Sequence, residues 1–178
     1  MRRILATITV VGLLAVALVA AGCGNGTKTV ASTSASGQVT TRTVPDVKFA
    51  KAKFVLHTGL AIGAFKKWIY DPYRAGTFKK GSSGRTKALV KAALAGAFTA
   101  NELKNARNAA LSDDRLRSLG DRMTALINKV QGLVPGLRSG NLNVASIATL
   151  AAGLGGVTAL ANTLGVNVRS LSPPALGG

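Results

Sequence analysis

Side chains that commonly carry catalysis or bind metal ions are scarce in this chain of 178 residues. His57 is its single histidine, Cys23 its single cysteine and Glu102 the single glutamate among six acidic residues. A metal site needs three or four nitrogen, oxygen or sulfur ligands at suitable spacing, and nucleophilic catalysis needs a base beside the nucleophile. The sequence offers neither pattern, so we expect a protein that is not an enzyme and that holds neither metal nor cofactor. The alternative is a site that joins His57 to residues from distant parts of the chain.

Basic and aromatic side chains, in contrast, are abundant and gather in one stretch. Lysine and arginine number 23 in the whole chain, which gives a formal net charge of +17. Twelve of them fall in residues 42–91 against two acids, and seven of the eight aromatic residues lie between Phe49 and Phe78. Positive charge of this density indicates an anionic neighbour, and rings beside lysines suit a bilayer interface or a sugar-phosphate polymer. The alternative is a surface that is positive only to stay soluble.

The best candidates for an anionic contact surround the Asp71-Pro72 turn. They are Lys66, Lys67, Tyr70, Tyr73, Arg74, Lys79 and Lys80. Phe54, Phe65 and Trp68 are close by in the sequence, but their spacing places them on one face of a helix. We therefore interpret these three rings as part of the core.

The first 22 residues have the pattern of a signal peptide. Two arginines follow Met1, residues 4–21 carry no charge, and small residues close the segment. This order of positive head, apolar middle and small-residue exit is typical of secretory export. The apolar run is also long enough for a retained membrane helix, but the Gly, Ser and Thr-rich sequence after it does not continue a helix.

Val19-Ala20-Ala21-Gly22-Cys23 resembles the lipobox of bacterial lipoproteins, with Ala20 where leucine is usual. The resemblance covers residues 1–23 only. It implies that the Cys23 thiol receives a diacylglyceryl group, that the chain is cut before Cys23, and that acyl chains such as palmitate hold it on the outer face of the cell membrane. Two or more acyl chains make such an anchor stable. A lone cysteine suits this use, because it has no internal disulfide partner.

The part of the chain after the signal peptide divides by composition into three segments. Residues 23–44 are rich in Gly, Ser and Thr and are expected to form a flexible, lipidated tether. Residues 45–166 carry helical periodicity and are the expected helical domain, while residues 167–178 are expected to be a loose tail. The predicted fold class is therefore all-α, a small bundle of about four helices after a tether.

Four amphipathic stretches predict the helices of this bundle. They cover about Val47–Tyr70, Arg85–Leu111, Ser112–Val134 and Leu142–Leu164. Asp46 is expected to cap the first helix and Asp71-Pro72 to end it. Ser112 is expected to cap the third helix, which Pro135-Gly136 ends, and Gly165 follows the fourth as a C-terminal glycine.

Two glycine-containing stretches need a separate interpretation. Gly59 and Gly63 form a GxxxG spacing in the first predicted helix, in an uncharged run too short to span a bilayer, so the spacing predicts tight packing within the bundle. The last predicted helix lies in residues 139–168, which carry no charge. We expect it to be buried in the bundle, and membrane insertion or self-association through its glycines is the alternative.

Together these features predict a lipid-anchored, non-enzymatic protein of the cell envelope whose basic helical domain binds an anionic membrane surface or a cell-wall polymer. Outside the cytoplasm such lipids and polymers are close by and nucleic acid is scarce, so nucleic acid is not an expected partner. The alternative is a helical interaction or self-assembly module that uses the glycine-rich helix 142–164, with an envelope protein as its partner.

Overall fold

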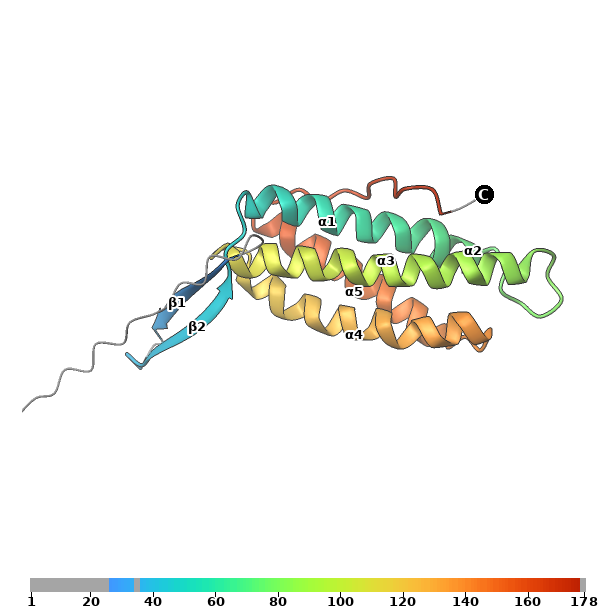
Figure 1. The fold of residues 1–178 in the computed structure, drawn as a ribbon, viewed down its shortest axis with the longest axis horizontal. Helices are drawn as coiled ribbons and strands as arrows, with labels where there is room; N and C mark the ends of the chain where they lie inside the picture. Colours follow the sequence, from blue (N-terminus) through green and yellow to red (C-terminus); the bar gives the residue numbers. More distant parts are fainter. Residues whose placement is uncertain (1–25, 34–35, 177–178) are drawn as a thin grey trace, which may run out of the picture.

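The computed structural model describes residues 26–33 and 36–176. Cys23 and the predicted signal peptide lie outside the described residues. Four long helices form a bundle (Figure 1), which confirms the predicted helical fold class. They are α1 (Ala50–Phe65), α3 (Arg85–Ser112), α4 (Arg117–Ser139) and α5 (Val144–Thr163). Helix α3 packs between α1 and α4, and α5 packs against α4.

Apolar periodicity accounts for the core, most clearly in α4. Its buried residues recur at intervals of three and four, which places them on one face of the helix. They are Leu119, Met123, Leu126, Ile127, Val130, Leu133 and Leu137. Helix α3 contributes mainly small buried side chains, so its neighbours come close. A side-chain carbon added at Gly96 would lie 2.9 Å from Cγ2 of Val134.

The predicted helix end at Asp71-Pro72 is wrong. After α1 the chain continues through a π-helical turn (Lys66–Tyr70) directly into α2 (Asp71–Arg74). Pro72 stands in the first turn of α2, where a missing N–H removes no helical hydrogen bond. The irregular loop is therefore confined to residues 75–84.

The predicted boundaries around α4 are also wrong. Pro135 lies inside α4, which continues to Ser139 and is followed by Gly140, whose φ of 73° suits glycine. The apolar stripe continues past Pro135 to the buried Leu137, and this packing explains why the helix persists beyond the proline. Ser112 does not cap α4. It ends α3, and its hydroxyl accepts a hydrogen bond from the N–H of Val47 at 2.9 Å.

A β-hairpin replaces the described part of the flexible tether predicted for residues 23–44. Strands β1 (Thr27–Thr33) and β2 (Val39–Pro45) pair antiparallel, with Thr27 opposite Pro45. Their β-branched threonines and valines favour extended backbone over coil. The prediction of irregular structure is therefore wrong here.

The hairpin is attached to the bundle at its base. Val44 is buried, and Nη2 of Arg42 lies 3.3 Å from Oδ1 of Asp121 on α4. The N–H of Asp46 donates to the carbonyl of Gly26, which ties the start of the described chain to the same place. The predicted cap at Asp46 is absent, because Phe49 occupies the position before α1.

The sequence predicts a loose tail for residues 167–178. The described part of this segment, which follows α5, packs against the bundle instead. Val168 is buried, and the N–H of Leu171 donates to the carbonyl of Gly59 at 3.0 Å. A side-chain carbon at Gly63 would overlap the carbonyl oxygen of Leu171. The GxxxG spacing thus permits tight packing within the fold, as predicted, but its neighbour is the C-terminal segment.

Candidate anion-binding site

The bundle has two ends (Figure 1), and they differ in charge. At the hairpin end, the hairpin meets the start of α1 and the end of α3, and at the loop end, α2 and the loop 75–84 precede the start of α3. Residues 66–91 of the loop end carry eight Lys or Arg side chains against one acid, Asp71. Four of the other five acids belong to the hairpin end, because they lie between β2 and α1, between α3 and α4, or in the first turns of α4: Asp46, Asp113, Asp114 and Asp121. The loop end therefore has a positive charge that acids do not balance.

A surface hollow of about 280 Å³ at the loop end is lined by three lysines and one aromatic ring. We call it the lysine hollow, and its lining residues are Lys67, Trp68, Pro72, Thr77, Gly84, Lys87, Ala88 and Lys91. The Nζ atoms of Lys67 and Lys91 lie 5.0 Å and 5.2 Å from the centre of the Trp68 ring. An ammonium group is attracted to the face of an indole, which holds both lysine side chains over the ring. No acidic residue of the described chain lines the lysine hollow.

The start of α3 adds to this positive field. Gly84 precedes α3 with a φ of 72°, provides no side-chain cap and lines the lysine hollow. The first turn of α3 contains no acidic residue. A helix N-terminus carries partial positive charge from its aligned peptide dipoles, and anions are stabilised there. Three lysines and a helix start thus line one hollow, and a bound anion would relieve the repulsion between the lysine charges.

Of the seven residues predicted to contact an anionic surface, Lys67 alone lines the lysine hollow. Lys66 is paired instead with Asp71, with 2.8 Å between Nζ and Oδ2. The Arg74 guanidinium lies 6.0 Å from the centre of the Tyr70 ring, and its Nη1 is 3.5 Å from the hydroxyl. Lys66, Tyr70 and Arg74 therefore contact other residues of the protein.

The remaining predicted residues are dispersed. Lys79 and Lys80 are exposed on the loop, and Tyr73 is half-buried against the core. Lys66 and Tyr70 line a second hollow, of about 440 Å³, between α1 and α5. The predicted set therefore spreads over two faces of the loop end and does not form one site.

Trp68, Lys87 and Lys91 are the functional candidates that sequence reasoning misses. The spacing of Trp68 indicates core, but its ring is only half-buried, and its indole N–H has no hydrogen-bond partner in the described chain. Lys87 and Lys91 are four residues apart, so they share one face of a predicted helix. That spacing is the signal that could have found them.

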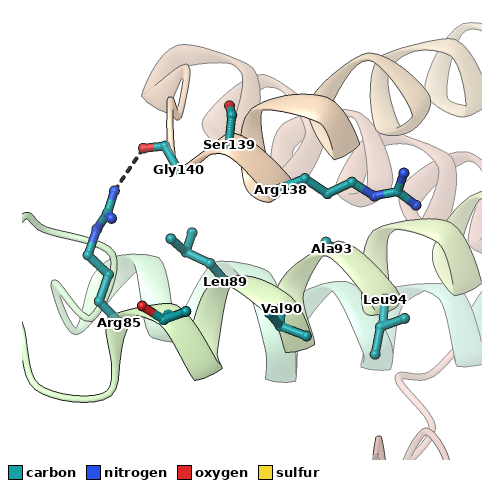
Figure 2. Close-up of a pocket in the computed structure, with 9 residues that line it drawn as sticks. Arg85, Leu89, Val90, Ala93, Leu94, Arg138, Ser139 and Gly140 are labelled. Carbon is teal, nitrogen blue, oxygen red and sulfur yellow. Dashed lines mark hydrogen bonds between the residues drawn. The ribbon is translucent and has the colours of Figure 1, made fainter.

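Arg85, also at the loop end, has an internal role (Figure 2). Its Nε donates to the carbonyl of Phe78 at 2.9 Å and its Nη2 to the carbonyl of Gly140 at 2.8 Å. These two bonds tie the loop to the end of α4 and hold the start of α3. The adjoining hollow of about 380 Å³ has the exposed Val90 and Leu94 in its wall. Arg85 therefore positions the loop end through its Nε and Nη2.

His57 and Glu102 are hydrogen-bonded between α1 and α3. Nδ1 of His57 lies 2.7 Å from Oε2 of Glu102, and only 9% of the Glu102 side chain is exposed. Two further polar groups on these helices, the hydroxyls of Thr58 and Thr99, are buried without a partner in the described chain. Among the residues that the structure describes, no three His, Cys, Asp or Glu side chains are grouped so as to hold a metal ion.

Helix α5 is the one described helix whose length and mean hydropathy of 1.8 would allow it to cross a membrane. Its buried residues face the bundle, and they are Ile147, Leu150, Leu154, Val157 and Ala161. The residues on its outer side are mainly alanine, glycine and threonine. A core helix of a soluble bundle has the same length and composition, so these properties alone do not place α5 in a membrane.

Comparison with family models, curated proteins and solved structures finds no match to this chain. The functional interpretation therefore depends on the residues and the geometry described above.

Proposed function

We propose that this chain is a lipid-anchored, non-enzymatic protein of the cell envelope whose loop end binds an anionic polymer through the lysine hollow. The lipid is assigned to Cys23 on the lipobox resemblance of residues 19–23. The polymer would be a cell-wall chain with repeated phosphate or carboxylate groups. The observation that carries the proposal is a hollow lined by three lysines and by no acid of the described chain, with two of the lysines over the Trp68 ring.

The length of the bundle favours such a polymer over the headgroups of the anchoring membrane. Gly26 is bonded to the hairpin end, and the three peptide units from Cys23 to Gly26 span at most about 11 Å. Helix α3 has 28 residues, which corresponds to about 42 Å at 1.5 Å per residue. A bundle standing on its hairpin end would therefore hold the lysine hollow about 40 Å beyond the anchored end, clear of its own lipid headgroups.

The expected contribution of the three lysines is large enough to measure. A lysine close to an anionic surface contributes about 1 kcal/mol at physiological ionic strength. Three of them correspond to roughly a hundredfold in affinity, because about 1.4 kcal/mol is a factor of ten. Salt should reduce this affinity, since exposed charges are screened within about 10 Å at 0.1 M.

Charge reversal in the lysine hollow tests the binding proposal. The variant Lys67→Glu, Lys87→Glu, Lys91→Glu should lose at least about a hundredfold in affinity for purified wall polymer, measured by co-sedimentation at increasing salt. The matched control reverses three exposed lysines or arginines outside the loop end, namely Lys104→Glu, Arg122→Glu and Lys129→Glu. It changes the net charge equally and should keep most of the binding.

Two outcomes would contradict the binding proposal. Equal losses in both triple variants would mean that net charge alone attracts the polymer. Binding of the wild-type lysine hollow to anionic vesicles, without binding to polymer, would identify lipid headgroups as the ligand.

The proposed lipid has its own test. Mass spectrometry of the protein from a membrane fraction should find an N-terminus at Cys23 that carries acyl chains. Recovery of the protein from the cytosol, with Met1 in place and an unmodified Cys23 thiol, would contradict the proposed location in the cell envelope.

A second candidate function, self-assembly through α5, is favoured by one observation. A side-chain carbon at Gly155 or at Gly156 would meet no atom within 4 Å, so the internal packing of the bundle does not require these glycines. Their exposed surface would let another helix approach closely. Association by this route would be insensitive to salt and would be lost in Gly155→Leu and Gly156→Leu, as sedimentation can measure.

A further inference from the structure

The hairpin end exposes an apolar surface that polymer binding at the loop end does not use. A shallow hollow of about 770 Å³ opens beside the first turns of α1. We call its apolar lining the Phe49 surface, which consists of Phe49, Ala50, Ala52, Val55, Leu56 and Leu171. Phe49 is 82% exposed, Leu56 46% and Leu171 37%. Isolated exposed apolar residues are ordinary, but a contiguous group indicates a contact surface.

Phe49 combines this exposure with an unfavourable backbone. Its φ of 56° and ψ of 39° lie in the left-handed region, and it is the only non-glycine residue of the described chain with a positive φ. Glycine adopts this conformation without steric cost, whereas a side chain does not. A large ring is thus kept at a strained and exposed position, although little within the described chain covers it. Strain of this kind is often found at functional positions.

Three cations flank the Phe49 surface, at the end of the bundle that also holds Asp46, Asp113 and Asp114. Lys48, Lys51 and Arg169 are exposed, and none of them forms an ion pair within the described residues. Asp113 is the one acid that lines the hollow, and its Oδ1 accepts a hydrogen bond from the N–H of Arg115 at 2.9 Å. Apolar rings and long basic side chains together match the interface of a bilayer, where rings lie at headgroup depth and cations meet anionic lipid.

The Phe49 surface also lies close to the proposed lipid. The carbonyl of Gly26 is bonded to the N–H of Asp46, and Phe49 follows Asp46 by three residues, which span at most about 11 Å. Cys23 precedes Gly26 by three residues and is limited to the same span of about 11 Å. An acyl chain on Cys23 and the Phe49 ring can therefore enter one bilayer together.

We infer that the Phe49 surface is a second membrane contact, which inserts into the headgroup region of the bilayer that holds the lipid on Cys23. Lys48, Lys51 and Arg169 lie against anionic headgroups in this contact. A second copy of the chain is a poorer occupant, because a self-complementary contact would bring these like charges together. The inference rests on the proposed lipid anchor and is independent of the polymer.

A tryptophan placed on the Phe49 surface tests this contact directly. The lipidated protein is reconstituted in vesicles of phosphatidylcholine and phosphatidylglycerol whose acyl chains carry bromine, a quencher of indole fluorescence. The test variant is Phe49→Trp with Trp68→Phe, which leaves one tryptophan in the chain. The matched control is Val90→Trp with Trp68→Phe, since Val90 is also exposed, at 55%, but lies on α3 at the loop end.

We expect the tryptophan at position 49 to be quenched about threefold or more above the control, with emission shifted to the blue, as for a ring at headgroup depth. Equal quenching at the two positions would overturn the inference. Sedimentation that shows a dimer formed through the residue at position 49, with no quenching of its tryptophan by the lipid, would also overturn the inference. These results are distinguishable from a failure of the proposed function: a missing lipid leaves the protein unable to float with vesicles, and polymer binding is read separately by co-sedimentation.

Discussion

The lysine hollow and the Phe49 surface lie at opposite ends of the same bundle, yet they consist of different kinds of side chain. The lysine hollow is lined by three lysines, two of them over a half-buried ring, and the nearby acid, Asp71, is already paired with Lys66. On the Phe49 surface an exposed ring at a strained position adjoins aliphatic side chains, with most of the acids at the same end. The loop end thus presents charge around a partly covered ring, and the hairpin end presents apolar area flanked by Lys48, Lys51 and Arg169.

This difference separates two kinds of contact. Charge attracts a partner over about 10 Å at 0.1 M salt and weakens as salt rises. Apolar area acts only on contact, and screening does not weaken it. A diffuse polyanion suits the first and the sharp boundary of a bilayer suits the second. Helices α1 and α3 connect the two ends, so a contact at one end orients the other.

The largest expected effect concerns the middle of the bundle, where His57 pairs with Glu102. His57→Leu leaves the buried Glu102 carboxylate without that partner and should lower the free energy of unfolding by about 2–3 kcal/mol. The double variant His57→Leu, Glu102→Leu should recover most of the loss, because it removes both polar groups together.

Urea unfolding followed at both ends measures this effect. Trp68 fluorescence reports on the loop end and far-ultraviolet circular dichroism on all helices, and the two transitions should coincide. Separate transitions would mean that the two ends unfold independently and are not parts of one cooperative unit. A contact at one end would then not orient the other.

The next effect concerns the C-terminal segment that packs along α1. Gly63→Ala places a methyl group where the Leu171 carbonyl oxygen lies, so it should destabilise the protein by about 1–3 kcal/mol. Gly155→Ala is the matched control. Its added carbon meets no neighbour, and the better helix former should stabilise the protein by about 0.5–1 kcal/mol. Thermal unfolding that shifts the same way for both variants would contradict the described packing.

A smaller effect is expected from the ring in the lysine hollow. Trp68→Leu removes the face over which Lys67 and Lys91 are held, and it should weaken polymer binding about fivefold, since each cation–π contact contributes about 0.5–1 kcal/mol. Tyr70→Leu alters a ring on the other face of the loop end and should leave polymer affinity unchanged. Equal weakening by the two substitutions, in the same co-sedimentation assay, would argue against a specific role for the lysine hollow.

The smallest expected effect is a gain in stability rather than a loss. Phe49→Gly removes a left-handed strain of about 1–2 kcal/mol, while glycine adds an entropic cost of about 0.5–1 kcal/mol, so stability in solution should rise by about 0.5 kcal/mol. Phe49→Ala keeps the strain and should show no such rise. A loss of stability in Phe49→Gly, measured by urea unfolding without lipid, would show that the ring is needed for folding rather than for contact with a bilayer.

Local patterns predict much of this fold. The stripe from Leu119 to Leu133 identifies α4 because each helix must bury one apolar face. The hairpin is missed because threonine, serine and glycine suit a tether as well as a two-stranded sheet, and docking through Val44 decides between them. The helix end at Pro72 is wrong because a proline in the first turn of a new helix loses no bond.

The site is less predictable than the fold, because it depends on contacts between distant segments. Nothing local places Lys91 over the Trp68 ring, or Leu171 against Gly59. The basic and aromatic composition draws attention to residues 66–80, yet most of the predicted residues there are paired internally or lie on another face than the lysine hollow. The lysine hollow becomes visible only when the start of α3 is packed beside the π-helical turn.

The separation of the two ends is tested most directly by the one natural tryptophan, Trp68, in the loop end. Lipidated wild-type protein is reconstituted in vesicles with brominated lipids, and its fluorescence is recorded before and after the addition of purified wall polymer. We expect Trp68 to be unquenched by the lipid and to change its emission when the polymer binds. Strong quenching by the lipid, with no response to the polymer, would show that the loop end contacts its own membrane and would contradict the account.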